Sequence, residues 1–236
     1  MNARNPLDDS SYPPFEGFPR EALSFLRKLK RNNNRPWFQA HRTEYEECVR
    51  FPMQTLIADL ARDMAGVAPE IEFHPVRSIF RIYRDVRFST NKAPYKTNIA
   101  ASFEVRSGAG PTETPGLYVG IEPGEIWVGG GLYMPTAPQL KAIRRSIAEE
   151  PEGWLAVVEA PRFRKVFGGI DGEKLSRAPL GYPADHPMIE HLKQKQLYAG
   201  VVLDDAACRS PRFLKKVESV FTDLMPLIRW LVKAIS

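Results

Sequence analysis

Five cationic residues fall within a stretch of 16 positions, and they are the residues of this sequence best suited to chemistry. Guanidinium groups bind phosphate and carboxylate through paired N–H donors, lysines add point charge, and hydroxyls between them donate neutral hydrogen bonds. We therefore predict a loop that binds a small phosphorylated or carboxylated ligand. The residues that would hold and orient the anion are Arg81, Arg84, Arg87, Ser89, Lys92, Tyr95 and Lys96.

Two further residues would move a proton if the protein is an enzyme, which the sequence does not decide. Asp85 directly follows Arg84, where it could orient an arginine or act as a base. His186 follows Asp185, and a carboxylate with an imidazole supplies the groups of general acid–base catalysis. The alternative for His186 is structural, because adjacent side chains seldom point the same way and an Asp-His-Pro turn can cap the helix expected near Pro187.

A run of three glycines, Gly129 to Gly131, ends an expected strand shortly before a helix that starts at Thr136. Glycines let the backbone approach a ligand closely, and a helix N-terminus offers unpaired N–H groups to an anion. Gly129 and Gly130 are therefore candidate ligand-binding residues, as is Arg177 in a later Pro/Gly-rich stretch. The alternative is a β-bulge or tight packing, since the run matches no nucleotide-binding motif.

The sequence indicates no metal site and identifies no cofactor. The four histidines are scattered, and the five-residue separation of His186 and His191 misses a common helical face. Cys48 and Cys208 lie far apart and form no C-x-x-C pair, so neither a zinc site nor a disulfide framework is suggested.

The net charge of +5 is concentrated in one segment of the 236-residue chain. Residues 76–106 contain seven basic and two acidic residues, and the remainder of the chain is balanced. A localised excess creates a field that attracts anions. The alternative is a solvated cationic face whose salt bridges contribute about 0–1 kcal/mol each.

Helices are expected at both ends of the chain and strands between them. An apolar stripe predicts a helix from Pro19, Asn34 should cap a second helix, a third should run from Pro52 to Gly66, and Thr136 with Gln139 forms a capping box. Further helices are expected at 153–159 and 210–234, and a loop at 85–98. Strands are expected at 77–84, 99–106, 117–122, 125–132 and 197–203.

This order predicts an α+β fold, in which a mainly antiparallel sheet of about five strands is packed by N-terminal and C-terminal helices. Residues 1–18 read as a flexible arm and residues 19–236 as a single domain. The composition, 43% hydrophobic and 26% charged, is that of a soluble globular protein. With neither a membrane-length apolar stretch nor an apolar signal core, we expect a cytoplasmic protein without membrane partners.

Four groups of residues carry a family resemblance: Asn33–Phe38 with Arg42 and Tyr45; Arg81–Ser89 with Lys92, Pro94, Tyr95 and Lys96; Pro123–Glu125 with Gly129–Gly131; and Arg177, Pro179, Gly181, Tyr182, Asp185 and His186. Together they resemble domain-of-unknown-function family 2461, a conserved bacterial and fungal group. The resemblance implies one continuous domain of about 200 residues and no particular activity. Asn91 departs from it, because an acidic residue is expected there. We hypothesise that the matched elements converge on one cleft.

Two other functions compete with small-ligand binding. A nucleic-acid-binding module would use the cations of residues 76–106 with Tyr83, Phe88 and Tyr95 for base stacking. A protein-interaction domain would use exposed tryptophans as anchors, and the chain has four, Trp37, Trp127, Trp154 and Trp230. The oligomeric state stays open.

Overall fold

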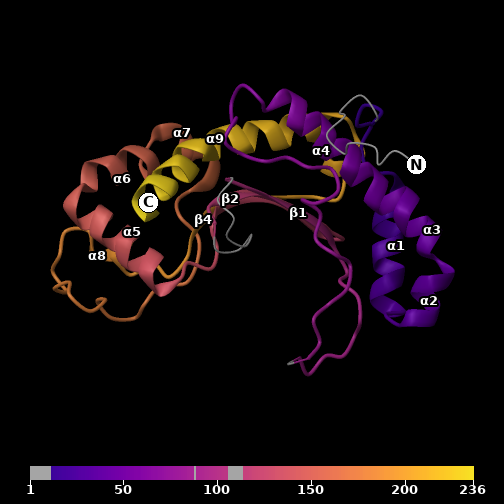
Figure 1. Cartoon of the computed structure of the whole chain (residues 1–236), viewed down its shortest axis with the longest axis horizontal. Coiled ribbons are helices and arrows are strands. Elements are labelled where there is room, and N and C mark those ends of the chain that lie inside the picture. The colour runs from indigo at the N-terminus through magenta and orange to yellow at the C-terminus, as the bar shows by residue number, and fades with distance from the viewer. Residues whose placement is uncertain (1–11, 88, 106–113) are drawn as a thin grey trace, which may run out of the picture. The chain divides into compact units, whose positions relative to one another are not determined.

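The computed structural model describes residues 12–87, 89–105 and 114–236 and confirms the α+β fold. One open antiparallel sheet has the strand order β1-β2-β3-β4 (Figure 1). Its strands are β1 (Ile99–Glu104), β2 (Gly116–Glu122), β3 (Glu125–Leu132) and β4 (Leu197–Leu203). These four agree closely with the predicted strands. The segment of the fifth expected strand, at 77–84, forms only isolated bridges, from Ile79 to Ala101 in β1 and from Tyr83 to Tyr95.

The contacts within the chain divide it into two compact units, and the expectation of a single domain after residue 18 stays a prediction. The first unit comprises Met1–Phe103, Tyr118–Val128 and Val202–Ser219. The second comprises Glu104–Leu117, Gly129–Val201 and Val220–Ser236. The cationic stretch at 81–96 lies in the first unit, and the glycine run, Arg177 and His186 lie in the second.

Helices of the first unit follow the expected pattern. They are α1 (Arg20–Arg31), α2 (Arg35–Ala40), α3 (Arg42–Tyr45), the π-helix η2 (Glu46–Arg50), α4 (Phe51–Asp63) and the short 3-10 helix η3 (Ala207–Arg209). The apolar stripe of α1 is buried, and Figure 1 shows α1, α2 and α3 side by side. Asn34 caps α2 as predicted, because its side chain accepts a hydrogen bond from the Trp37 N–H at 3.0 Å.

The residues before α1 are anchored more firmly than their composition indicates. We expected an arm up to residue 18, of which residues 1–11 lie outside the described part. Phe15 and Phe18, however, are buried and pack with Phe213, with ring centroids 5.7–6.4 Å apart. The Phe15 N–H also donates to the Asp59 carboxylate at 2.9 Å. Two aromatic side chains thus fix the segment that leads into α1.

Helices of the second unit are α5 (Ala137–Glu149), α6 (Pro151–Val158), α7 (Pro161–Phe167) and α8 (Ile189–Leu192), and α9 (Arg212–Ile235) has residues in both units. The capping box of Thr136 and Gln139 at the start of α5 is confirmed. The helix α7 was not predicted; it begins at Pro161, which suits a first helical turn. Trp154, fully buried in α6, donates to the His191 ring at 2.9 Å.

Candidate functional site

The cationic stretch forms a hairpin-like excursion whose two legs pair at their base. An isolated antiparallel bridge joins Tyr83 to Tyr95. On either side of it, the Arg84 N–H donates to the Pro94 carbonyl at 2.9 Å and the Lys96 N–H donates to the Ile82 carbonyl at 2.8 Å. The region between, expected as a loop, contains no regular strand or helix in its described residues. These contacts bring Arg84 and Lys96 together although they are twelve positions apart in sequence.

Asn33, in the connection between α1 and α2, holds this hairpin in place. Its side-chain amide donates to the Tyr95 carbonyl at 3.0 Å, and its carbonyl oxygen accepts from the Tyr95 N–H at 3.0 Å. The amide thereby pairs with a backbone residue as a neighbouring strand would. The Tyr95 ring is 1% exposed and stacks on Phe38, with centroids 4.2 Å apart. The first helices and the hairpin are therefore joined by both polar and apolar contacts.

A pocket of about 320 Å³ lies where the hairpin meets the end of α1. Three of its lining residues are cationic: Lys30, Arg84 and Lys96. The rest of the lining is Asn33, Asn91, Ala93, Tyr95, Thr97 and Asn98, which is predominantly amide and hydroxyl. We call it the anion pocket. Cationic groups surrounded by neutral donors are the arrangement that holds a phosphate or carboxylate.

Two of the three cations are not neutralised by the protein. Within residues 12–87, 89–105 and 114–236, neither Arg84 nor Lys96 forms a salt bridge with a carboxylate. The Lys30 ammonium lies 4.0 Å from a carboxylate oxygen of Glu122, which also accepts a hydrogen bond from Thr97 at 3.1 Å. Positive charge therefore faces this pocket without a matching negative charge.

Lys96 is the most strongly perturbed of these cations. Burial of its ammonium, and secondarily the charge of Arg81, lowers the pKa of Lys96 below its ordinary value. The ammonium lies 5.0 Å from the centre of the Phe80 ring, a favourable cation–π contact. A bound anion would reverse the effect on the pKa, because it favours the charged form.

Arg87 and Asp85, both predicted site residues, bind each other. The Arg87 guanidinium donates to the two carboxylate oxygens of Asp85 at 2.7 and 3.1 Å, and the Arg87 N–H also donates to this carboxylate at 3.1 Å. These hydrogen bonds lower the pKa of Asp85 to about 2. A carboxylate with so low a pKa is a weak proton acceptor, so the geometry does not favour Asp85 as a general base.

Three other predicted residues of the cationic stretch lie outside the lining of the anion pocket. The Lys92 ammonium donates to the Val86 carbonyl at 3.0 Å, and Ser89 is half-buried in the same turn, with its N–H directed to that carbonyl at 3.4 Å. Arg81 lines a different pocket, described below. Of the seven residues predicted to hold or orient the anion, the structure thus gathers Arg84, Tyr95 and Lys96.

The glycine run lies in β3, where close strand packing accounts for it. A Cβ atom on Gly130 would lie 2.6 Å from the Gly116 carbonyl oxygen. One on Gly131, whose φ is +139°, would lie 2.2 Å from the Leu197 carbonyl oxygen. Gly129 and Gly130 are buried. These contacts are those of the tight-packing alternative.

The remaining predicted residues lie in the exposed connection between α7 and α8. Arg177 and Asp185 are exposed. The His186 ring nitrogen Nδ1 accepts a hydrogen bond from the Met188 N–H at 3.0 Å, just before α8 begins at Ile189. The imidazole thus stabilises the backbone turn, as the structural alternative for His186 proposed.

The lining residues Lys30, Asn33 and Asn98 were not predicted. Lys30 and Asn33 lie more than 50 positions from Arg84 in sequence, and long-range contacts such as that between Asn33 and Tyr95 bring them to the hairpin. Asn33 did appear in the family resemblance, as the start of the Asn33–Phe38 motif. Asn33 directly precedes Asn34, and helix capping by Asn34 was a sufficient local explanation for the asparagine run. The long-range contact of Asn33 with Tyr95 was therefore not expected.

The described residues contain neither a grouped set of metal ligands nor a fully exposed tryptophan. In the described part of the chain, no three histidine, cysteine, aspartate or glutamate side chains are grouped as a metal site requires. Trp154 is fully buried and Trp37, Trp127 and Trp230 are partly covered, so none of the four is a prominent exposed anchor. Among the described residues, no helix has the length and apolar character needed to cross a membrane.

The fold and the pocket define an antiparallel α+β protein with a cationic, amide-lined pocket built on a hairpin. The family model described as conserved hypothetical protein (DUF2461) matches residues 21–230, and the chain belongs to this family. The resemblance noted in the sequence is therefore confirmed. No curated protein matches the chain.

Proposed function

We propose that this protein binds a small phosphorylated or carboxylated compound in the anion pocket. The observation that carries the proposal is that Arg84 and Lys96 face this pocket without a carboxylate partner among the described residues. Arg84 supplies a planar pair of donors for two oxygens of one anion, and Lys96 supplies point charge. An anion would also remove the electrostatic cost that the lowered pKa of Lys96 records.

The neutral groups of the pocket support binding of oxygen-rich ligands. The Asn91 side-chain carbonyl accepts from the Ala93 N–H at 2.9 Å, which leaves its NH₂ group available to donate. Asn98 and Thr97 add further polar groups to the lining. The volume of about 320 Å³ is at the lower end of the range of ligand pockets, about 300–1,000 Å³, so the compound should be small.

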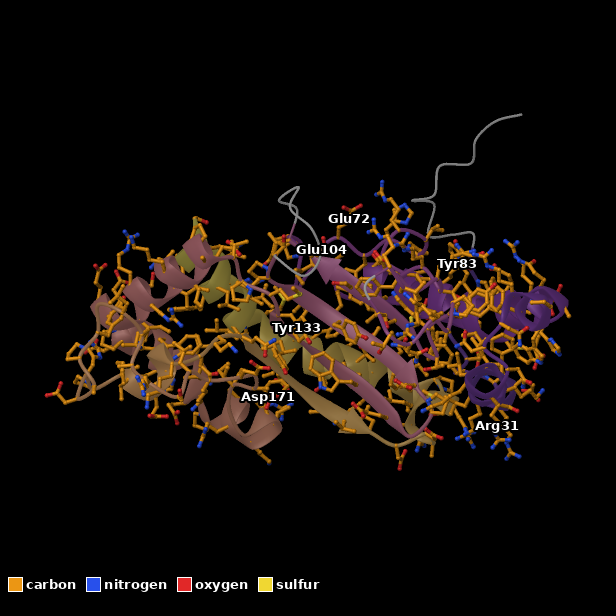
Figure 2. All side chains as sticks on the ribbon, turned by 90° about the horizontal axis from the view of Figure 1, so that it is seen from below. Arg31, Glu72, Tyr83, Glu104, Tyr133 and Asp171 are labelled. Atoms are coloured by element: carbon orange, nitrogen blue, oxygen red, sulfur yellow. The ribbon has the colours of Figure 1, made fainter. Side chains whose placement is uncertain are left out.

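The nucleic-acid alternative has less support from the arrangement of the aromatic rings. Tyr95 is 1% exposed and already stacked on Phe38, so it cannot stack on a base. Phe88 lies outside the described residues. Of the two expected stacking residues that the structure describes, Tyr83 is exposed, with 47% of its surface accessible (Figure 2). Stacking on several successive bases is what gives single-stranded binding its affinity.

Titration calorimetry of the full chain with inorganic phosphate and with acetate tests the proposal and separates the two ligand classes. Arg84→Gln and Lys96→Gln should each weaken binding at least tenfold, since a hydrogen bond to a charged group contributes about 1.5–3 kcal/mol. Arg87→Gln is the matched control, because it removes the same charge from the same hairpin but from a side chain already bound to Asp85. If all three variants weaken anion binding equally, the effect is a general loss of positive charge, and the proposed binding in the anion pocket is refuted.

A further inference from the structure

A second pocket, of about 270 Å³, is lined by residues that contact Tyr95. Tyr95 lines the anion pocket, and its ring contacts Phe38 and Tyr83, with centroid distances of 4.2 and 5.5 Å. Both of these residues line the second pocket. We call it the Tyr45 pocket, after the tyrosine at the end of α3. Its walls come from α2, α3, η2 and residues 79–83, all within the first compact unit.

Tyr45 brings an unused hydrogen-bonding group to this pocket. The residue is 4% exposed, and its ring packs against Phe25 and Phe38 at centroid distances of 5.8 and 5.4 Å. Its hydroxyl has no hydrogen-bond partner in the part of the chain that the structure describes. Burial raises the pKa of Tyr45 to about 12, so the hydroxyl is protonated at neutral pH and can donate. Because the protein does not fully enclose the hydroxyl oxygen, this group is accessible from the pocket, and a ligand atom there would accept its hydrogen bond.

The charges around the pocket leave one cation uncompensated. The Glu46 carboxylate forms a salt bridge of 2.9 Å with the Arg50 guanidinium. It also lies 4.0 Å from the Arg42 guanidinium. Arg81 has no salt bridge to any carboxylate of the described residues. It is exposed, so it can turn toward a ligand without breaking an existing contact. The pocket therefore offers a guanidinium fork and a phenol hydroxyl as donors.

The remaining walls are apolar and mostly aromatic. Phe38 and Tyr45 form the inner part, and Ile79 and Phe80 add half-buried apolar surface. Tyr83, labelled in Figure 2, is 47% exposed and supplies a ring face at an accessible position. Aromatic rings pack on one another in offset or edge-to-face arrangements, each worth about 0.5–1.5 kcal/mol beyond the buried area. The lining thus differs from the amide-rich anion pocket.

We propose that the Tyr45 pocket is a second ligand site, which binds a single-ring aromatic carboxylate. The carboxylate accepts hydrogen bonds from the Arg81 guanidinium and the Tyr45 hydroxyl, and the ring packs against Phe38 and Tyr83. The small volume admits one ring. The Tyr45 pocket has none of the lining residues of the anion pocket, although Arg81 is close enough to Lys96 to lower its pKa.

Saturation-transfer NMR and calorimetry on the full chain, with benzoate as the probe, test the site. Benzoate should bind at least tenfold more tightly than acetate, which lacks the ring, and than benzyl alcohol, which lacks the charge. Arg81→Gln should weaken benzoate binding at least tenfold, and Tyr45→Phe about tenfold, because each removes a hydrogen bond to a charged group. The phenylalanine variant retains the buried ring, so the fold is preserved.

Two control variants locate the effect. Arg77→Gln removes a cation four positions from Arg81 that already pairs with Glu72, and Arg84→Gln removes one from the anion pocket. Both should leave benzoate affinity within twofold of the wild type, and Tyr45→Phe should leave phosphate affinity unchanged. Three results would each overturn the proposal. Benzoate binds no better than acetate; uracil, a single-ring compound without a carboxylate, displaces benzoate at equal concentration; or Tyr45→Phe binds benzoate as tightly as the wild type does.

Discussion

Replacing Asn33 with alanine tests whether the hairpin is held by the asparagine side chain. The substitution removes two hydrogen bonds of 3.0 Å to the backbone of Tyr95. At about 1 kcal/mol for each, the free energy of unfolding should fall by about 2 kcal/mol. For a chain of this size that corresponds to a decrease of about 4–8 °C in the unfolding midpoint. Because the hairpin forms one wall of the anion pocket, phosphate affinity should fall as well.

The two flanking asparagines provide matched controls. The Asn32 side chain donates to the Lys28 carbonyl on the exposed end of α1, so Asn32→Ala should cost less than about 0.5 kcal/mol. Asn34 caps α2 through the Trp37 N–H, and losing a cap costs about 1 kcal/mol. Three identical substitutions at adjacent positions should therefore give three different effects, with Asn33 the largest.

Urea unfolding followed by circular dichroism measures these differences, and hydrogen exchange of the Tyr95 amide reports the local contact. Asn33→Ala should accelerate exchange at Tyr95, whereas Asn32→Ala should not. If Asn33→Ala is no more destabilising than Asn32→Ala, the hairpin is held by its aromatic packing alone, and the role assigned to the Asn33 amide is wrong. Phosphate affinity that is unchanged in Asn33→Ala would likewise show that the anion pocket does not depend on this contact.

Three further outcomes follow from the same structure. The folded-state pKa of Lys96 lies below its unfolded value, so its charged form costs stability at neutral pH, and this cost decreases as the pH rises from the folded-state pKa to the unfolded-state pKa. Lys96→Met should therefore raise the thermal midpoint at pH 7 while abolishing phosphate binding; a lower midpoint would contradict this. Gly131→Ala places a Cβ 2.2 Å from a backbone oxygen at a φ of +139° and should cost about 2–3 kcal/mol in urea unfolding, whereas Gly66→Ala, with no atom within 4 Å, should be nearly neutral. Burial raises the pKa of the Cys208 thiol to about 11, so iodoacetamide should label half-buried Cys48 at least tenfold faster in the native protein, as mass spectrometry would show.

Local signals in the sequence were sufficient to predict the regular elements. The apolar stripe in α1, the cap at Asn34 and the capping box at Thr136 each act over a few residues, so their outcome depends little on the rest of the chain. The strands β1 to β4 were predicted for the same reason. The segment at 77–84 had the composition of a strand, but strand formation also requires a partner, and its pairing is limited to single bridges.

The sequence could not predict which pocket each cationic side chain lines, because the pockets are formed by contacts between residues that are distant in sequence. Arg81 and Arg84 are three positions apart, yet they line different pockets. The hairpin pairing of Tyr83 with Tyr95 determines which residues from 91–98 face Arg84. No periodicity in the sequence indicates that pairing, and none indicates that Lys30 completes the anion pocket.

The excess positive charge was compatible with two interpretations, an anion site or a solvated face with salt bridges, and the contacts of the individual residues favour different interpretations within one segment. Arg77 and Arg87 are exposed and paired with Glu72 and Asp85 respectively, as a solvated face requires. Such pairs contribute little to stability, and their charge is already compensated within the protein. Arg84 and Lys96 in the anion pocket and Arg81 in the Tyr45 pocket are not compensated in this way. If the proposed binding is correct, substitutions of these unpaired cations should weaken it, and substitutions of Arg77 and Arg87 should not.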